Sequence, residues 1–210
     1  MPVGVFQCNC IILGDPQTLE AIVIDPGSET EKIMKKVRAH GLKVKEIVHT
    51  HTHIDHIGST TALQKETNAR VALHREDLPL YENRTEQAKF LRIPLPVVEK
   101  PVGVDEFLVD GYAIRAGGLE GQTLHTPGHT PGSCTFYFPK VAETGILFPG
   151  DTLFAGSIGR TDLWKGDYDQ EINSIKKKLL PLGDDIIVIP GHGSKTTIGF
   201  EKKNNPFLIH

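Results

Sequence analysis

The sequence feature that most constrains this chain is a dense run of potential metal ligands at residues 50–56, Thr-His-Thr-His-Ile-Asp-His. The potential ligands in it are His51, His53, Asp55 and His56. The run follows, after His49, residues 46–48, which are predicted to end a buried strand. Side chains at a strand end can converge on one point, whereas those along a straight strand alternate between its faces. Zinc, iron and manganese accept imidazole nitrogen and carboxylate oxygen, so the run predicts a metal site. A chance cluster is the competing interpretation, which the density of the run disfavours.

Single residues of the same ligand type follow three later strand-like segments. They are His129, Asp151 and His192. Glycine or proline stands beside each of them, and glycine allows the backbone to approach a bound group closely. One such residue alone is more typical of ordinary loop surface. Together with the first run, the three residues predict a sheet edge at which the ligands gather.

Apolar periodicity predicts alternating strands and helices in both halves of the chain. Such a pattern is typical of two sheets packed face to face with helices outside, and we expect one domain over residues 1–210. An extended surface segment is expected at residues 93–103, which contain three prolines. The expected helices are 30–40, 59–67, 75–91 and 169–180. The expected strands are 5–13, 19–25, 43–48, 70–73, 112–116, 122–126, 133–138, 146–148 and 185–189.

Composition narrows the classes of function. The chain has 210 residues, 39% of them apolar, which is enough for a sizeable core. A net charge of −3 with dispersed basic residues excludes an electrostatic footprint for nucleic acid. No apolar run approaches the ~20 residues that span a bilayer, and no export signal precedes the first strand. We therefore expect a cytoplasmic protein with neither a nucleic-acid nor a membrane partner.

The cysteines leave two interpretations open. Cys8, Cys10 and Cys134 are odd in number and lie in strand-like apolar surroundings. Cys8 and Cys10 share one face of a strand, so a zinc-binding pair is conceivable. Buried free thiols are the more frequent outcome for such positions.

The order and spacing of the ligand-type residues resemble the metallo-β-lactamase superfamily. The likeness runs from near residue 3 to near residue 207. The segment 156–162 (Gly-Ser-Ile-Gly-Arg-Thr-Asp) and the ending at residues 191–207 are similar to the short, single-domain bacterial members of the glyoxalase II-like (hydroxyacylglutathione hydrolase-like) branch. The resemblance implies an α/β fold, the four-layer αββα sandwich, without a C-terminal helical substrate domain.

The resemblance also implies a dinuclear centre with two divalent metal ions. Zinc is expected first, with iron or manganese as alternatives. One ion would be held by His51, His53 and His129, the other by Asp55, His56 and His192, and Asp151 would bridge them. Such ions typically lie ~3.5–4 Å apart and share a water whose pKa falls towards ~7, which supplies a hydroxide nucleophile. Asp55 would additionally act as a catalytic residue that orients this hydroxide and takes its proton.

Three further residues are candidates for orienting the ligands from behind. They are Thr50, Thr52 and Asp25, the last because it ends a strand near the same edge. An equally good interpretation makes Asp25 a turn-former.

Substrate recognition is implied at Arg160. The comparable basic residue of glyoxalase II enzymes contacts the glutathione part of the thioester, and Arg160 could bind a carboxylate bidentately. The alternative is an internal salt bridge with Asp162 or Asp167. The chain ends in apolar residues where the longer enzymes carry basic ones that grip glutathione. A small-molecule thioester is therefore the expected substrate, whereas the carrier thiol and the oligomeric state are left open.

Other functions within the superfamily are weighed against this hydrolase. A persulfide dioxygenase-like oxidoreductase would use a single iron held by two histidines and one aspartate. The full set of seven ligand positions favours two metals instead. A β-lactamase is disfavoured by the missing export signal, a nuclease by the missing RNA-binding segment, and a non-catalytic binding module by the intact ligand set.

Overall fold

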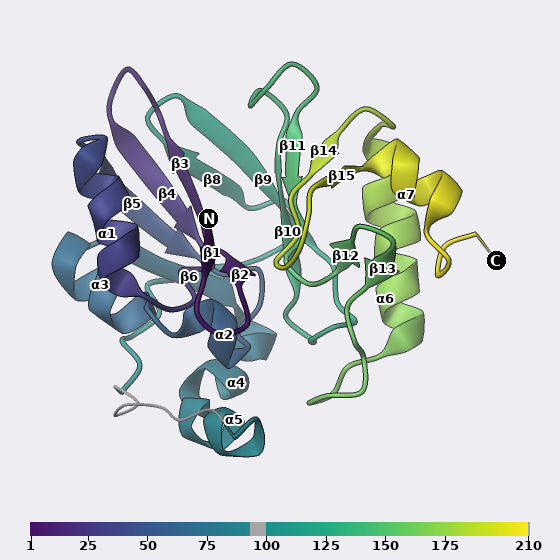
Figure 1. Ribbon diagram of the computed structural model, residues 1–210, viewed down its shortest axis with the longest axis horizontal. Helices are drawn as coiled ribbons and strands as arrows, with labels where there is room; N and C mark the ends of the chain where they lie inside the picture. The colour runs from purple at the N-terminus through teal and green to yellow at the C-terminus, as the bar shows by residue number, and fades with distance from the viewer. Residues whose placement is uncertain (93–99, 210) are drawn as a thin grey trace.

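The computed structural model describes residues 1–92 and 100–209. Its strands form two main sheets that pack face to face, and helices cover the outer face of each (Figure 1). The α/β class and the four-layer αββα sandwich expected from the sequence are confirmed. Within the described ranges, no helix is both long and apolar enough to cross a membrane.

The N-terminal half of the chain builds the first sheet and its covering helices. Its elements are β3 (Ile11–Gly14), β4 (Glu20–Ile24), α1 (Thr30–Ala39), β5 (Lys43–Val48), α2 (Ile54–Ile57), α3 (Thr60–Thr67), β6 (Arg70–His74) and β7 (Glu106–Leu108). The strands lie in numerical order, with β3 antiparallel to β4 and the remaining neighbours parallel. Parallel neighbours require crossover connections, so the carboxyl ends of β4, β5 and β6 meet at one edge.

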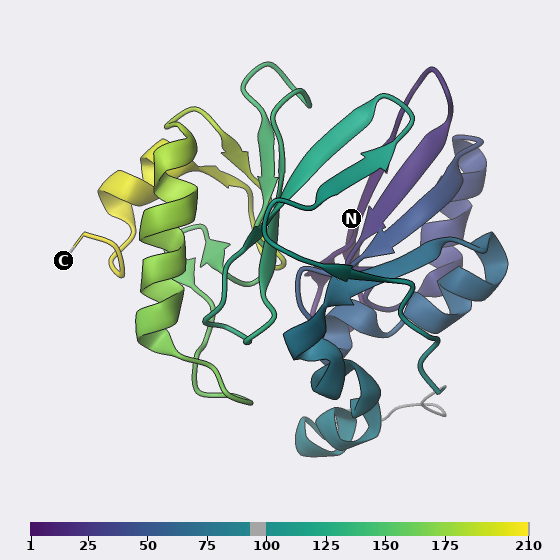
Figure 2. The same cartoon turned by 180° about the vertical axis from the view of Figure 1, so that it is seen from behind.

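The second half builds the other sheet. Its elements are β8 (Ala113–Ala116), β9 (Leu119–His125), β10 (Cys134–Phe138), β11 (Ile146–Phe148), α6 (Tyr168–Ser174), β14 (Ile187–Val188), β15 (Thr196–Thr197) and α7 (Ile198–Asn204). The strand order is β15-β14-β11-β10-β9-β8, in which only the β11–β14 pair is parallel among the described strands. Seen from behind, α6 lies along the outer face of this sheet (Figure 2).

Alternation along the strands divides the core into layers. In β4, Ile22 and Ile24 belong to the cluster between the sheets, where they meet Phe136 of the second sheet. Val23 points the other way and packs with Ile33 of α1. Because successive side chains of a strand face opposite sides, both faces of β4 are buried, which explains its continuous apolar sequence.

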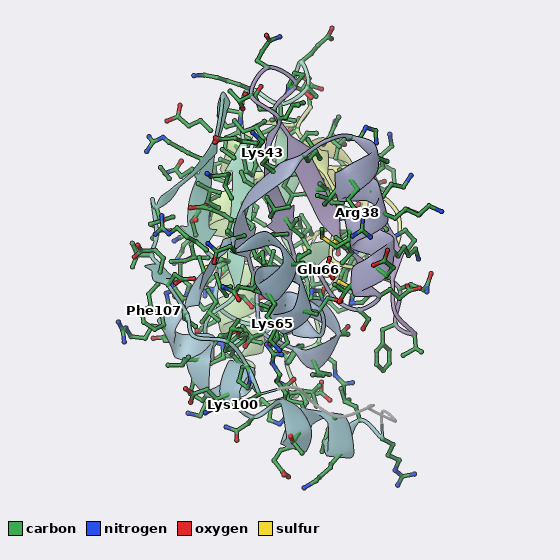
Figure 3. All side chains as sticks on the ribbon, turned by 90° about the vertical axis from the view of Figure 1, so that its left-hand side faces the viewer. Arg38, Lys43, Lys65, Glu66, Lys100 and Phe107 are labelled. Atoms are coloured by element: carbon green, nitrogen blue, oxygen red, sulfur yellow. The ribbon has the colours of Figure 1, made fainter. Side chains whose placement is uncertain are left out.

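Helix α1 shows the amphipathic pattern that predicted it. Ile33, Met34 and Val37 are buried, and the opposite face carries charged residues. Arg38 on that face reaches Glu66 of α3, with 3.5 Å between Nη1 and Oε2 (Figure 3). Both side chains are well exposed, so this ion pair adds little stability and the buried face holds the helix in place.

The prediction of one strand over residues 5–13 is wrong in part. The segment contains a turn, and short strands β1 (Pro2–Val3) and β2 (Cys8–Asn9) pair across it. Gly4 and Gln7 have positive φ angles of 69° and 55°, which a continuous strand does not allow. Only β3 joins the main sheet, antiparallel to β4 as expected.

The prediction of one helix over residues 75–91 is also wrong. The segment divides into a 3₁₀ turn, η1 (Arg75–Asp77), and two short helices, α4 (Leu78–Glu82) and α5 (Arg84–Phe90). Pro79 occupies the first turn of α4, where its missing N–H is tolerated. The Asn83 amide then donates to Pro79 O at 2.7 Å and helps to end that helix.

Several short elements were not expected from the sequence. They are β7, β12 (Leu153–Phe154), β13 (Ser157–Ile158), β15, α2 and α7. Most have too few residues to show a period. Residues 93–99 of the expected extended segment lie outside the described residues. The three cysteines are buried free thiols, and none belongs to a potential metal-binding group in the described part of the chain.

Candidate metal centre

The first four ligand-type residues lie where the carboxyl end of β5 meets α2. Buried carboxylates from neighbouring segments hold the loop between β5 and α2. Thr50 N donates to Asp25 Oδ1 at 2.8 Å, and Thr52 N donates to Asp77 Oδ2 at 2.9 Å. These bonds fix the backbone on both sides of His51. The sequence therefore places the histidines on a loop whose shape is set by neighbouring strands and turns.

The remaining three ligand-type residues come from the second sheet. His129 lies in the loop after β9, Asp151 follows β11, and His192 follows β14. The structure brings these residues together with the first four, at the edge where the strand ends of both sheets meet. All seven positions proposed from the sequence therefore lie together at this edge.

His51, His53 and His129 form the first group of donors, called the histidine trio below. Nε2 of His129 lies 3.2 Å from His51 Nε2 and 2.9 Å from His53 Nδ1. The rings meet edge to face, with interplanar angles of 80° to 90°. Rings in this arrangement can direct lone pairs to one central point, as ligands of a single ion do.

Asp55, His56 and His192 form the second group. His192 Nε2 lies 3.1 Å from Asp55 Oδ2 and 3.2 Å from His56 Nε2. The donor atoms of this group all lie within 4.8 Å of one another, as do those of the histidine trio.

Asp151 lies between the two groups. Its Oδ2 is 3.7 Å from His129 Nε2 and 3.7 Å from His192 Nε2, and its Oδ1 is 3.5 Å from His56 Nε2. A carboxylate in this position can reach both groups at once. It also supplies negative charge where two cations would otherwise repel each other.

Apart from His53, the histidines of the two groups have their second ring nitrogen engaged behind the site. His56 Nδ1 contacts Asp25 Oδ2 at 3.1 Å, His129 Nδ1 contacts the carbonyl of Arg160 at 2.7 Å, and His192 Nδ1 contacts that of Phe6 at 2.9 Å. Such partners fix the tautomer and leave Nε2 as the free donor. The orienting role expected for Asp25 matches this geometry.

The charge states of the histidine trio and of Asp55 suit metal binding. Burial lowers the pKa of His51, His53 and His129, so these rings are neutral at neutral pH and offer lone pairs. Burial opposes ionisation of Asp55, but His56 and the hydrogen bond from His192 outweigh it and hold its pKa below the usual range. Asp55 is therefore an ionised ligand.

A buried atom without a hydrogen-bond partner tests whether this donor set fits metal ions. Asp151 Oδ1 is buried and unpaired within the described residues. An unsatisfied buried polar atom is costly, and two imidazole nitrogens that both present lone pairs at 3.2 Å do not bond to each other. Cations at the two groups would satisfy both features, so the residues fit a pair of divalent ions.

An apolar cavity of about 380 Å³ opens beside the donors. Its lining includes Phe6, Leu91, Phe154, Leu163 and Trp164. The Trp164 ring lies 5.2 Å from that of His53 and 5.2 Å from that of Phe90. Sequence reasoning missed Trp164, although it is the only tryptophan of the chain and closely follows the Gly-Arg-Thr-Asp segment.

The side chain of Arg160 is turned to solvent. Its guanidinium forms two hydrogen bonds with Asp162, at 2.7 and 2.8 Å, and 57% of the side chain is exposed. The structure thus has the internal salt bridge weighed as the alternative, with Asp162 as the partner. Asp167 instead caps α6 by accepting from Gln170 N. Arg160 still lines the cavity, and its carbonyl orients His129.

A further group of potential ligands, His74, Glu76 and His125, lies at the ends of β6 and β9. The two imidazoles are stacked, with centroids 4.0 Å apart and an interplanar angle of 12°. Lone pairs of parallel rings do not converge. Unlike the histidine trio, this group therefore does not direct its imidazole lone pairs to a single ion.

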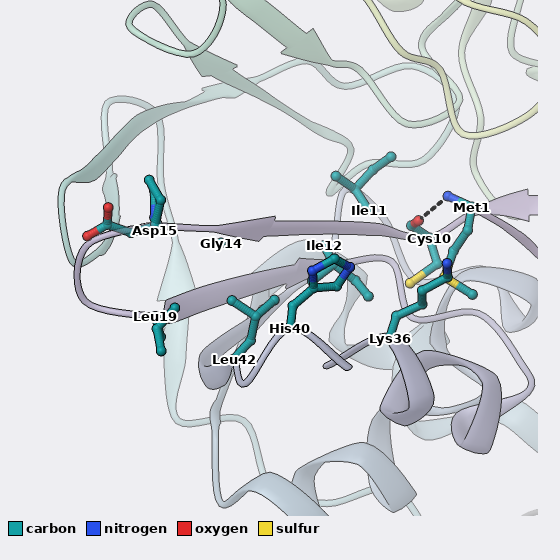
Figure 4. A pocket seen from close by; sticks show the side chains of 11 residues that line it. Met1, Cys10, Ile11, Ile12, Gly14, Asp15, Leu19, Lys36, His40 and Leu42 are labelled. Atoms are coloured by element: carbon teal, nitrogen blue, oxygen red, sulfur yellow. Dashed lines mark hydrogen bonds between the residues drawn. The ribbon is translucent and has the colours of Figure 1, made fainter. Parts of the chain in front are cut away.

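A larger cavity, of about 650 Å³, lies along β3, and none of the seven donor residues lines it (Figure 4). Ile12, Leu19 and Leu42 line it together with His40 and Lys36 (Figure 4). The Met1 ammonium donates to Cys10 O at 2.7 Å beside it. It contains none of the potential metal-binding groups of the described residues.

Comparisons with known proteins agree with this geometry. Hydroxyacylglutathione hydrolase GloC of Haemophilus influenzae is 41% identical, over 99% of this chain and 96% of that protein. The solved structure of BLEG-1 B3 metallo-beta-lactamase matches with a TM-score of 0.89 at 36% identity, covering 100% of this chain and 98% of that one. The di-iron-bound form of TTHA1623 gives 0.87 at 38%, covering 99% and 98%.

A more distant structure, ETHE1 from Myxococcus xanthus, has a TM-score of 0.76 at 28% identity, covering 95% of this chain and 78% of that one. The family model of the metallo-beta-lactamase superfamily matches residues 3–192, which include all seven ligand-type positions. The chain therefore belongs to the metallo-beta-lactamase superfamily.

Proposed function

We propose that this protein is a metal-dependent hydrolase that cleaves small-molecule thioesters of the hydroxyacylglutathione kind. The observation that carries the proposal is the pair of donor groups joined by Asp151 in the wall of an apolar cavity. GloC, similar over almost its whole length, is named a hydroxyacylglutathione hydrolase. We further propose that residues 1–210 work as a single domain.

The histidine trio would hold one divalent ion, and Asp55, His56 and His192 the second. Ions bound there would polarise a carbonyl and lower the pKa of water, so no side-chain nucleophile is needed. Zinc is proposed first. Iron and manganese use the same ligands, and the di-iron-bound form of TTHA1623 supports iron as an alternative.

The side chains around the donors have separate tasks. Asp55 lines the cavity as an ionised carboxylate, and we propose that it orients an attacking water and takes its proton. The apolar walls formed by Phe154, Leu163 and Trp164 would receive the acyl group or the carrier chain and exclude water. Cys8, Cys10 and Cys134 are buried outside this lining, so they offer no thiol for a covalent acyl intermediate.

The alternative is a persulfide dioxygenase-like oxidoreductase with one iron, which the likeness to ETHE1 keeps in view. Such a site needs only two histidines and one aspartate. The complete second group, with His192 oriented through Phe6, supports two ions.

One set of measurements tests the proposal. Metal content of the purified protein is measured alongside three assays: lactoylglutathione cleavage, oxygen uptake with glutathione persulfide, and hydrolysis of a β-lactam. We expect about two ions per chain and thioester cleavage as the fastest reaction. About one iron per chain with persulfide-dependent oxygen uptake would establish the oxidoreductase instead.

A further inference from the structure

Asp77, in the 3₁₀ turn between β6 and α4, joins two loops that lie far apart in the sequence. It is fully buried. Its Oδ2 accepts from Thr52 N at 2.9 Å and from Thr130 Oγ1 at 2.9 Å, and its Oδ1 accepts from Gly132 N at 2.7 Å. Thr52 Oγ1 additionally donates to the carbonyl of Asp77 at 2.9 Å. Neither of the two loops contains Asp77 itself.

The two loops that Asp77 joins are those that supply the histidine trio. Thr52 stands between His51 and His53, and Thr130 directly follows His129. One loop extends from the first sheet and the other from the second. Their relative position therefore depends on a group that bonds to both, and Asp77 is such a group.

Gly132 shows how closely the His129 loop approaches this carboxylate. A Cβ added at Gly132 would lie 2.6 Å from Asp77 Cγ and 2.6 Å from Oδ1. The φ angle of Gly132 is outside the left-handed region, so space rather than backbone conformation requires glycine here. The close contact between Asp77 and Gly132 therefore limits how far the His129 loop can shift relative to Asp77.

The second donor group is held by a different carboxylate. Asp25 accepts from Thr50 N at 2.8 Å, from the Thr50 hydroxyl, and from His56 Nδ1 at 3.1 Å. Among the described residues, Asp77 forms no hydrogen bond with a residue adjacent to His56, Asp151 or His192. Asp25 thus supports His56 and the backbone before His51, whereas Asp77 joins the two loops that carry the histidine trio.

We propose that Asp77 is a positioning residue that sets the spacing of the His51–His53 loop and the His129 loop, and through it the metal affinity of the histidine trio. This inference rests on the dinuclear centre of the proposed function. A small displacement of either loop would separate the three donor nitrogens, which a single ion requires at short, fixed distances. The second group, which Asp77 does not support, would keep its affinity.

The test is the stepwise titration of metal-depleted, full-length protein with Zn²⁺ against a chromophoric chelator. Asp77→Asn keeps the size of the side chain but directs an amide N–H at one of its donors. We expect the affinity for one of two ions to fall about 10- to 100-fold, the range found for partners behind a ligand, and the other to be unchanged. Gly132→Ala, whose added Cβ would displace the Asp77 carboxylate, should lower the affinity for the same ion.

A matched control separates positioning from general stability. Glu201 is likewise fully buried and accepts from Gly156 N, Thr196 Oγ1 and Asn205 Nδ2, all outside the ligand loops. Glu201→Gln should lower the melting temperature without changing either affinity. If Asp77→Asn does not fold, Thr130→Val, which removes one of the bonds, takes its place and should weaken the same ion less.

Two results would overturn the inference. One is unchanged affinity for both ions in Asp77→Asn. The other is an equal loss at both ions in Asp77→Asn and Glu201→Gln, which would make Asp77 a general stabilising group. Failure of the native protein to cleave any thioester would refute the proposed function only, because the titration follows metal binding and not turnover.

Discussion

The Nε2 atoms of His56 and His192 face each other at 3.2 Å, although 136 positions separate the two residues in the chain. Each ring has its other nitrogen engaged, His56 with Asp25 and His192 with the carbonyl of Phe6. Two lone-pair donors are thus held towards a common point by partners behind them. A shared cation explains why the fold places them so.

His192→Ala is expected to remove about one of two bound metal ions per chain, because the second group loses a donor while the histidine trio stays complete. Elemental analysis of the purified protein measures this. His125→Ala is the matched control and should keep the native metal content, since the stacked pair of His74 and His125 does not converge on a point. Full metal content in His192→Ala would remove His192 from the ligand set.

Asp151→Ala is expected to lower the content of both ions and to reduce thioester turnover at least 100-fold. The carboxylate lies within 3.7 Å of donors from both groups, so its loss affects both and leaves two cations facing each other with less compensation. Asp162→Ala removes an exposed carboxylate nearby and serves as the control. Loss of only one ion in Asp151→Ala would contradict the bridging position.

Gly191→Ala is expected to lower turnover about 100-fold, the size of effect that a misplacement of ~1 Å can have. A Cβ at this residue would lie 2.2 Å from Asp151 Oδ1 and 2.9 Å from His56 Cε1. Gly103→Ala is the control, because a Cβ there meets nothing within 4 Å. Steady-state kinetics of both variants gives the comparison, and native turnover in Gly191→Ala would mean that the centre tolerates displacement.

Arg160→Ala distinguishes two roles of this residue. If its guanidinium leaves Asp162 to bind substrate, KM should rise several-fold for thioesters whose carrier bears a carboxylate and stay constant for small neutral ones, because lost ground-state binding appears in KM. Kinetics with one thioester of each kind measures this. Equal behaviour towards both would assign Arg160 to its ion pair with Asp162 alone.

His74→Gln is expected to make the stability of the protein less sensitive to acid. Burial and the stacked His125 lower the pKa of His74 to about 4, against 6.5 in an unfolded chain. Between these values the unfolded chain binds a proton that the folded protein does not, so the free energy of unfolding falls as the pH drops from 6.5 to 4. Urea unfolding across this pH window should show that the free energy of unfolding of His74→Gln depends less steeply on pH than that of the native protein.

The sequence predicted the layers because the periodic segments are long enough to show their period. Helix α1 buries one face at helical spacing, and strands β4 and β5 are buried along most of their length. The segment before β3 and the helices α4 and α5 were mispredicted, since single residues such as Gln7 and Pro79 decide the chain direction there. In such segments the local turn conformation, rather than the apolar periodicity, determines the structure.

The meeting of the seven ligand-type residues was foreseen because each of them follows a strand or lies in the dense first run. The supports behind them were foreseen only in part. Asp25 was a candidate because it ends a strand, whereas Asp77 lies in a segment that the sequence predicted as part of a helix. Its role depends on three donors distant in sequence, which only the folded structure identifies.

The donors are divided between the two halves of the polypeptide. Strands β3 to β7 and their connections carry His51, His53, Asp55 and His56, whereas His129, Asp151 and His192 belong to the strands that follow. Each ion would therefore act as a clasp between the halves, in addition to any role in chemistry. Resistance to unfolding should then track the free metal concentration, because an ion that binds only the closed sandwich stabilises it by mass action. In a cell short of metal, the protein would be inactive and would also unfold more readily between its two halves.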